Sequence, residues 1–316
     1  MPSLLREHQH ELCDVDGTNG FVFGTDETGY LTLTRPVITA GDYRVGDVER
    51  PQEDGIAFGR DYIGPKTYTF ELGVITDRSN GLAYPASKGG AHRANLDALN
   101  ELEGRWRARK WRNSASFIAM LRSCEGGRTV RCYGRPRRWD ESAGALTQQG
   151  FTPVVAEFAL VDHHWYDDVE QIAQVRGVIA KSGGVIAPIV APITTTLASS
   201  PGSTVVNVEG PIPTWVVVEF NGPVSDPSVT IDDDLTIGLT GSVAAGQKVT
   251  IDPRPWSRSV LRDPGAVGVA GMVSADSPIM RNMRLQAGRH TATYNGRDQT
   301  GTSYVRLRWR PARSRP

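Results

Sequence analysis

Apolar and polar residues alternate with a period near two in several short segments of the first half of the chain, which predicts β-strands. These segments span residues 21–23, 30–34 and 68–74, and Asp-Gly, Thr-Gly and Gly-Asp pairs between them predict turns. Residues 41–65 are charged, and we expect them to form a loop. The first half of the chain therefore has the pattern of a β-rich domain.

One short helix is predicted near residues 91–103, because Leu96, Leu99 and Leu102 recur three residues apart and form an apolar stripe. A Gly-Gly pair precedes this segment, and Gly104 is a plausible end of the helix. A helix of this length gains most of its stability by packing its stripe on a sheet.

A β-hairpin is predicted after the helix, with strands at 116–123 and 128–133 around a Glu-Gly-Gly turn. The sequence Tyr-Gly-Arg-Pro-Arg-Arg at 133–138 interrupts the strand pattern, and a long strand is expected at 152–166. Cys124 and Cys132 flank the turn of the hairpin. With an odd total of three cysteines and no CxxC pair, neither a disulfide framework nor a zinc site is favoured.

The second half begins with a segment of different composition, residues 171–204, which is poor in charge and rich in Ile, Val, Ala, Thr, Ser, Gly and Pro. We expect it to be an extended connection that packs as strands on its own domain or on a neighbour, the alternative being an ordinary loop. Several short strands separated by turns follow in 205–316, which predicts a β-sandwich. The predicted domains are therefore 1–170, with the helix, and 205–316, joined by 171–204.

Length and charge limit the class of protein further. A chain of 316 residues suits two domains. No apolar stretch reaches the roughly 18 residues of a membrane span, so no membrane insertion is expected. No signal peptide is predicted at residues 1–9. Equal numbers of basic and acidic residues, 35 of each, argue against a protein that coats nucleic acid and suit one that assembles with copies of itself.

The order of these features resembles the distal tail proteins of long-tailed, non-contractile bacteriophages, a group of minor tail proteins. A β domain with one helix leads through 133–138 to a strand that ends near 158–166. A sandwich follows, in which a strand runs into Asn221-Gly222-Pro223 and then into 226–229. The family typically has an Asn-Pro-x-Ile turn at the place of residues 226–229, and in this sequence Asp226 replaces the Asn of that turn. The resemblance covers roughly residues 55–310 and depends on the order of the motifs.

The resemblance implies a mainly β fold, with an N-terminal β-sandwich that forms a ring and a C-terminal sandwich like that of galectins or carbohydrate-binding modules. It implies a homohexameric ring that joins the tail-tube protein to the tail-tip hub protein and also lies near the tape-measure protein. The protein would be made in the host cytoplasm and end at the tail tip of the virion, without a cofactor. A ring of this kind repeats one heterologous interface around an axis.

The most concentrated charge lies in residues 104–138, which contain 11 basic residues and a single acid, Glu125. One interpretation is a subunit interface, because charge complementarity fixes the register of partners. A second interpretation is contact with DNA that passes through the channel, and a third is an ordinary solvated surface. The candidate interface residues are Arg105, Arg107, Arg109, Arg112, Arg135, Arg137 and Arg138.

Aromatic residues of the second domain are candidates for stacking on a sugar ring, as aromatic faces do through apolar contact. They are Trp256, Tyr294, Tyr304 and Trp309. The competing interpretation places them in the core of the sandwich. A host-surface glycan is therefore an alternative partner, and a carbohydrate-binding protein for host attachment is the alternative function.

Catalytic and metal sites are not predicted. His163 and His164 are adjacent on a strand and therefore point to opposite faces, and 232–234 lacks the pattern of a calcium loop. A third function, that of a wall-degrading glycosidase, needs two carboxylates that flank a sugar bond. The pairs Glu101 with Glu103 and Asp140 with Glu141 are the sequence candidates for it. The chain contains no GxSxG, HExxH or phosphate-loop motif.

Overall fold

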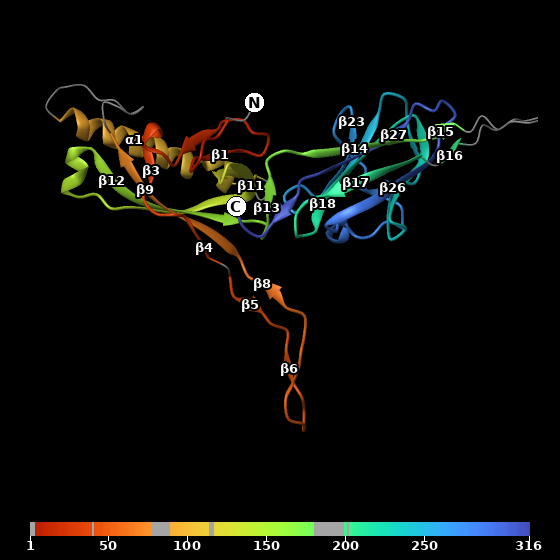
Figure 1. Ribbon diagram of the computed structural model, residues 1–316, viewed down its shortest axis with the longest axis horizontal. Coiled ribbons are helices and arrows are strands. Elements are labelled where there is room, and N and C mark those ends of the chain that lie inside the picture. The colour runs from red at the N-terminus through yellow and green to blue at the C-terminus, as the bar shows by residue number, and fades with distance from the viewer. Residues whose placement is uncertain (1–3, 40, 77–88, 114–116, 180–198, 201) are drawn as a thin grey trace, which may run out of the picture. The chain divides into compact units, whose positions relative to one another are not determined.

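Antiparallel β-sheets form most of the structure, together with one helix of several turns (Figure 1). This confirms the mainly β fold with one helix that the alternating pattern predicts. The computed structural model describes residues 4–39, 41–76, 89–113, 117–179, 199–200 and 202–316. The chain divides into two compact units: unit 1 comprises Met1–Asp168 with Ser314–Pro316, and unit 2 comprises Val169–Arg313.

Unit 1 is built on one large sheet that curls toward a barrel. Its edge strands approach each other where Gly24 N donates to Tyr30 O at 2.7 Å and Thr32 N donates to Gly24 O at 3.0 Å. A short strand, β4 (Val37–Thr39), pairs with residues 67–69 of β9, whereas β3 pairs with residues 72–74 of the same strand. The main strands, in their order across the sheet, are β2 (Phe21–Phe23), β1 (His10–Asp14), β10 (Ala119–Glu125), β11 (Arg128–Glu141), β12 (Phe151–Leu160), β9 (Lys66–Ile75) and β3 (Tyr30–Thr32).

The predicted helix is α1 (Gly90–Trp106), and it packs on this sheet as expected. Its buried side includes Leu99, Leu102 and Trp106, whereas Leu96 is exposed. The prediction for Leu96 was therefore wrong. The neighbouring Asn95 is buried instead and donates a hydrogen bond to Val74 O at 2.9 Å, which ties the helix to β9.

The predicted hairpin is formed by β10 and β11, and its two turn glycines both have positive φ. The expected interruption at 133–138 is wrong, because β11 continues through it. The irregular sequence produces only a shift of register between Pro136 and Trp139. In the register of the hairpin, Cys124 lies opposite Thr129 and Cys132 lies opposite Leu121, so the two cysteines do not face each other. All three cysteines are buried free thiols.

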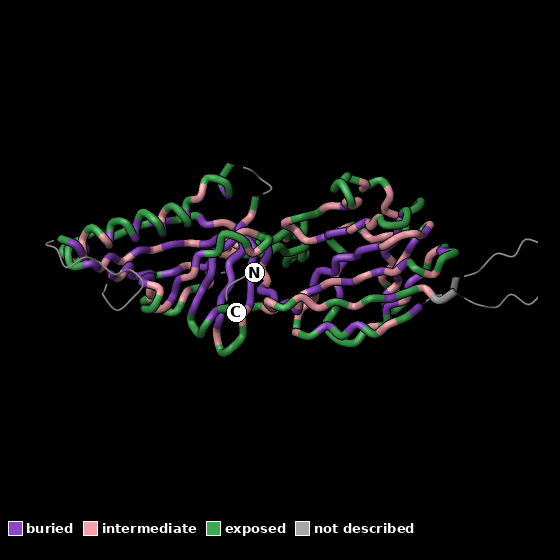
Figure 2. The backbone as a smooth tube through the Cα atoms, turned by 90° about the horizontal axis from the view of Figure 1, so that it is seen from above, coloured by how far each residue is buried: buried purple, intermediate pink, exposed green. Residues whose placement is uncertain are grey.

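Unit 2 contains two further sheets whose side chains share one core, so the sheets pack face to face. Buried positions run along the strands of each unit (Figure 2). The first sheet has the order β14 (Gln171–Arg176), β27 (Tyr304–Trp309), β18 (Thr214–Asn221), β22 (Lys248–Asp252), β23 (Ser259–Asp263) and β24 (Val267–Gly268). The second has the order β17 (Gly202–Val208), β26 (Gly288–Arg297), β19 (Val224–Ile231) and β20 (Leu235–Gly238).

The expected connection 171–204 is only partly described. Residues 171–176 form β14, which pairs with β27 in the first sheet of unit 2. Residues 180–198 lie outside the described residues, so the packing expected for them remains a prediction. Other short elements are β13 (Trp165–Asp167), β15 (Val178–Ile179), β16 (Ser199–Ser200), β21 (Ser242–Val243), β25 (Arg284–Leu285) and β28 (Ala312–Arg313), with 3-10 helices η1 (Asp26–Thr28), η2 (Ala145–Gln149), η3 (Ala270–Met272) and η4 (Met280–Asn282).

Candidate functional site

Residues 41–65, which we call the arm, form a long two-stranded ribbon that leaves the sheet of unit 1 (Figure 1). Two antiparallel pairs build the ribbon: β5 (Tyr43–Arg44) with β8 (Tyr62–Ile63), and β6 (Val48–Glu49) with β7 (Ile56–Ala57). The prediction of a charged loop was wrong, because the two sides of this segment pair with each other. Their short alternating segments, such as Tyr43-Arg44-Val45, are a signal that could have revealed the ribbon.

Glycines allow the two sides of the arm to approach closely at its middle. A Cβ atom placed on Gly59 would lie 1.9 Å from the carbonyl oxygen of Gly46, far inside any permitted contact. The Gly59 amide donates to the carboxylate of Asp47 at 2.9 Å. Close backbone approach is one of the few roles in a strand that only glycine fills.

The arm exposes large apolar side chains along its whole length. Tyr43 is 66% exposed and Phe58 is 86% exposed. The other exposed members are Val45, Val48, Ile56, Tyr62 and Ile63. An isolated two-stranded ribbon has little stability of its own, and a group of exposed apolar side chains typically marks a surface that binds another protein. The arm is therefore the strongest candidate for an assembly surface.

The arm also carries a net negative charge. It has six acidic and three basic side chains, a balance of −3. Arg44 and Arg60 lie 6.0 and 5.6 Å from the centre of the Tyr62 ring, and Arg50 pairs with Glu53 at 3.8 Å. The remaining acids include Asp42, Glu49, Asp54 and Asp61, which form no ion pair with any residue that the structure describes.

The predicted interface arginines lie at the end of α1, on the short helix that follows it and on β11, and hydrogen bonds join the end of α1 to β11. Trp106 Nε1 donates to Arg138 O at 3.1 Å and Arg107 Nη2 donates to Trp139 O at 3.4 Å, so the end of α1 is fixed to β11. The short helix α2 (Arg109–Arg112) follows α1 directly. We call seven exposed cationic residues at the end of α1, on α2 and in the later part of β11 the basic surface: Arg105, Arg107, Arg109, Lys110, Arg112, Arg137 and Arg138. Arg135 is half-buried and donates to Phe117 O at 2.9 Å.

Several cations of the basic surface already have a carboxylate partner. Arg105 pairs with Glu101 at 3.8 Å, Arg107 with Glu103 at 2.6 Å, and Arg138 with Asp140. Lys110 Nζ lies 2.6 Å from the carboxylate of Asp14. In the described part of the chain, no acidic side chain pairs with Arg109, Arg112 or Arg137. These three are the charges of the basic surface that remain available to another molecule.

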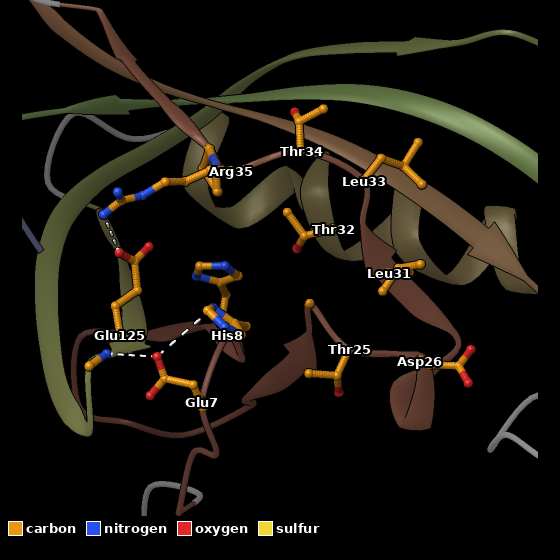
Figure 3. Close-up of a pocket in the computed structure, with 14 residues that line it drawn as sticks. Glu7, His8, Thr25, Asp26, Leu31, Thr32, Leu33, Thr34, Arg35 and Glu125 are labelled. Carbon is orange, nitrogen blue, oxygen red and sulfur yellow. Dashed lines mark hydrogen bonds and ion pairs between the residues drawn. The ribbon is translucent and has the colours of Figure 1, made fainter.

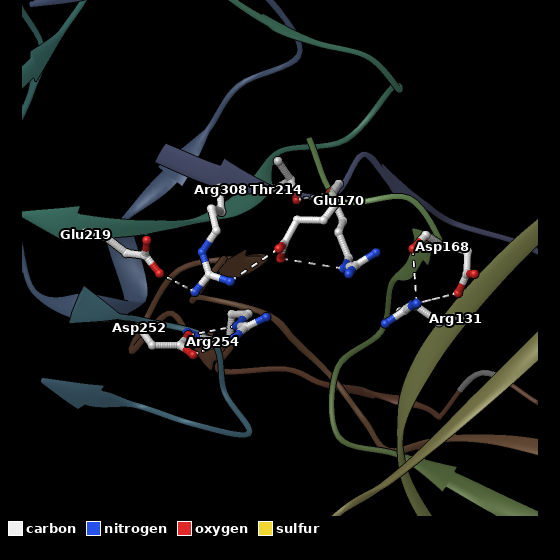
Figure 4. A network of polar contacts seen from close by, with 9 residues as sticks. Arg131, Asp168, Glu170, Thr214, Glu219, Asp252, Arg254 and Arg308 are labelled. Carbon is white, nitrogen blue, oxygen red and sulfur yellow. Dashed lines mark hydrogen bonds and ion pairs between the residues drawn. The ribbon is translucent and has the colours of Figure 1, made fainter. Parts of the chain in front are cut away.

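Two arginines of segment 104–138 have a structural role instead. Arg122 contacts Glu11 and lies 2.8 Å from Asp168. Arg131 lies 2.5 Å from the same carboxylate of Asp168 (Figure 4). Burial alone would raise the pKa of Asp168, but the hydrogen bonds and charges of the two arginines outweigh it and lower this pKa. The segment is therefore not one continuous basic face.

A cavity of about 600 Å³ lies between the N-terminal segment of unit 1 and residues 31–36 (Figure 3). Arg35 and Glu125 form an ion pair at 2.9 Å across its rim. The buried His10 lines it and bonds to Ser123, and burial lowers the pKa of His10 to about 3. Ser123 is fully buried and does not line the cavity, so the pair offers no accessible nucleophile.

The outer face of the first sheet of unit 2 carries charges that largely neutralise one another (Figure 4). Glu219 lies between Arg306 at 3.4 Å and Arg308 at 2.9 Å. Asp252 pairs with Arg254 at 2.6 Å on a neighbouring strand. The two pairs of Glu219 join β18 to β27. Because these carboxylates and arginines are paired, the net charge of this face is smaller than the number of its charged residues suggests.

The sugar-stacking candidates occupy different environments. Tyr294 and Trp309 are 1% and 5% exposed and belong to the core of unit 2, so a sugar ring has no access to their faces. Trp256 is half-buried beside Arg254. Tyr304 is half-buried on the outer face and lines a hollow of about 470 Å³ together with Asn221, Gln247, Lys248 and Asp263.

No metal-binding cluster is seen among the described residues. They contain no cluster of three or more His, Cys, Asp or Glu side chains that could hold a metal ion. Glu101 and Glu103 each pair with an arginine one turn further along α1. Of the helices that the structure describes, none combines the length and apolar character that crossing a membrane requires.

Comparison with solved structures shows that the chain shares its fold with a phage protein of the adsorption apparatus. The chain is similar to the SPP1 Dit protein (gp 19.1), described as a paradigm of the hub adsorption apparatus in phages that infect Gram-positive bacteria. The TM-score is 0.58 at 11% sequence identity, and the match covers 96% of this chain and 98% of that chain.

Weaker similarity extends to chains of the phage P2 baseplate in its activated conformation with Ca and with Sr. Their TM-score is 0.48 at 11% identity, over 95% of this chain and 97% of theirs. No protein-family model and no curated protein sequence matches the chain. The resemblance expected from the order of motifs is thus confirmed at the level of the fold.

Proposed function

We propose that this protein is a structural component of a phage tail tip, which forms a hexameric ring between the tail tube and the tail-tip hub. The observation that carries the proposal is the shared fold, which extends over both units and almost the whole of both chains. In this proposal its partners are copies of itself, the tail-tube protein, the hub protein and the tape-measure protein. It acts by binding and catalyses no reaction.

The arm supports an assembly role independently of the fold comparison. Its seven large exposed apolar side chains would be a liability in a protein that stays alone, because unprotected strands pair with other chains. In an assembled tail they would be covered by a neighbour, and each Å² of apolar area removed from water contributes about 25 cal/mol.

Electron microscopy tests the proposal in two ways. Particles of the purified protein, averaged from above, are expected to show six-fold rings. Gold-labelled antibodies against the protein are expected to bind the tail tip of intact virions. Labelling along the tail tube or on the capsid would overturn the proposed location, and rings with another symmetry would overturn the hexamer.

A second candidate function, glycan binding by unit 2, is favoured by the hollow beside Tyr304. Tyr304, Asn221, Lys248 and Asp263 line this hollow, and Lys248 Nζ lies 3.5 Å from the Asp263 carboxylate. An aromatic ring beside polar side chains is a combination that suits a sugar. The full-length protein is expected to bind host wall polysaccharide, and Tyr304→Ala is expected to weaken binding at least tenfold. Equal binding by Tyr304→Ala and by a control, Val267→Ala, would exclude this site.

A further inference from the structure

We propose that the arm of one copy docks on the basic surface of the next copy, so that these two surfaces form the repeating contact of the ring. This inference rests on the proposed function and identifies the two surfaces that would meet. It follows from three properties of the described residues: their unpaired charges, their exposed apolar side chains and their positions in unit 1.

The unpaired charges of the two surfaces are opposite in sign. On the arm, Asp42, Glu49, Asp54 and Asp61 lack an ion-pair partner within the described residues, and all four are exposed. On the basic surface the same is true of Arg109, Arg112 and Arg137. Complementary charges steer association and fix which surfaces meet. The unpaired negative charges of the arm are therefore complementary to the unpaired positive charges of the basic surface.

Apolar side chains accompany the charges on both surfaces. The arm presents Phe58 and Tyr43, its two most exposed aromatic residues. Beside the basic surface, Val15 is 41% exposed and follows Asp14, which binds Lys110. Phe117 is 58% exposed, and its carbonyl accepts a hydrogen bond from Arg135. Apolar and charged side chains occur together in typical protein–protein contacts, in which the apolar ones lie at the centre and the charged ones at the rim.

The partner proposed for the arm is a second copy of the chain. Within unit 1 the arm and α1 extend in different directions (Figure 1), and no ion pair between described residues joins the arm to the basic surface. Each side of the arm has about ten residues, and extended strands of that length reach about 30 Å. Because the two surfaces differ, their contact is heterologous, and a repeated heterologous contact closes into a ring or continues as a filament.

Charge reversal tests the contact, with the oligomeric state of the full-length protein as the readout. The arm variant is Glu49→Arg with Asp61→Arg, and the surface variant is Arg109→Glu with Arg112→Glu. Each is expected to weaken assembly about tenfold or more, because like charges then face each other. The combination of all four substitutions is expected to restore assembly, since the charges are again complementary. Analytical ultracentrifugation over a range of concentrations measures the change.

Matched controls carry the same changes in net charge on unit 2. They are Glu209→Arg with Asp276→Arg, and Arg281→Glu with Arg289→Glu, all at exposed positions. These controls are expected to assemble as the unmodified protein does. Circular dichroism of every variant establishes that folding is intact, which is expected because the substituted side chains are outside the core.

The outcomes separate this inference from the proposed function. If the unmodified protein forms rings but the combined variant does not recover, the arm docks elsewhere, and the inference is wrong while the ring stands. The same conclusion follows if the surface variant assembles normally. If the unmodified protein forms no ring in solution or in tails, the proposed function itself fails and the inference fails with it.

Discussion

The indole nitrogen of Trp106 donates a hydrogen bond of 3.1 Å to the carbonyl oxygen of Arg138. This bond connects the last turn of α1 to β11 at the place where the register of β11 shifts. Trp106 is also 2% exposed and has edge contacts with Phe23 and Phe70. One side chain therefore anchors the helix in the core and positions the arginines of the basic surface.

Removal of this anchor is expected to destabilise unit 1 strongly. Trp106→Ala leaves a cavity and should lower the free energy of unfolding by about 3–5 kcal/mol. Trp106→Phe retains much of the packing and loses the hydrogen bond, so it should cost less. Denaturant unfolding followed by fluorescence measures both. As a control, Leu96→Ala on the exposed side of the same helix should change stability by no more than about 0.5 kcal/mol.

A second prediction concerns the glycines of the arm. Gly59→Ala places a Cβ atom against the Gly46 backbone, which forces the two sides of the ribbon apart. The core of unit 1 does not include the arm, so the unfolding midpoint of unit 1 should remain unchanged. Limited proteolysis is expected to cut the arm of this variant faster, and ring formation should weaken in parallel. Unchanged proteolysis would show that the arm tolerates the wider spacing.

The matched glycine control lies in α1. A Cβ atom at Gly104 meets no neighbour within 4 Å. Gly104→Ala is therefore expected to stabilise the helix by about 0.5–1 kcal/mol, because alanine loses less backbone entropy than glycine on folding. Faster proteolysis of the arm in this variant would mean that the effect of Gly59→Ala is not local.

A third prediction follows from the buried ion cluster. Asp168→Asn removes the carboxylate that pairs with Arg131, whereas Arg122 keeps Glu11, and breaking a buried pair of this kind costs about 3–5 kcal/mol. The pKa of Asp168 is lowered in the folded protein, so its contribution is present above its unfolded pKa and is lost as the pH falls through the folded pKa. Acid unfolding of unit 1 should therefore begin at higher pH in the variant.

Sequence patterns predicted those features of the fold that depend on local alternation. The strand at Phe21–Phe23 and the β10–β11 hairpin are examples. The pattern could not show that Asn95 rather than Leu96 faces the sheet, because a hydrogen bond to Val74 O compensates for burying its amide. Such compensation depends on a residue that is distant in the sequence.

The sequence alone could not show which basic residues of the candidate site are exposed, because their burial also depends on residues that are distant in the sequence. Arg122 and Arg109 belong to the same basic segment, yet Arg122 is 4% exposed and thus buried, whereas Arg109 is exposed. The difference arises from Glu11 and Asp168, which lie far from Arg122 in the sequence. Likewise, the alternation that predicts the strands does not say which face of β27 is covered, and Trp309 lies on the buried face.

The last prediction concerns the turn between β19 and β20, which contains Asp232. His290, on the neighbouring strand β26, contacts the Asp232 side chain. His290 Nδ1 lies 2.5 Å from the Asp232 carboxylate and its Nε2 lies 2.8 Å from Gln286 O, so both ring nitrogens face acceptors. Burial by itself lowers the pKa of His290, but these two contacts outweigh it and raise this pKa above its ordinary value. The protonated form, in which both nitrogens donate, is therefore favoured in the folded protein.

Because the folded pKa of His290 is raised, its contribution to stability is fully present below the unfolded value of about 6.5 and is lost as the pH rises through the folded pKa. Unit 2 should therefore unfold at a higher denaturant concentration at pH 5.5 than at pH 8. Asp232→Asn should lower the pKa of His290, measured by NMR titration of its ring, and reduce this pH dependence. An unchanged titration in Asp232→Asn would show that the ion pair does not control the protonation of His290, because Gln286 O remains as its other acceptor in that variant.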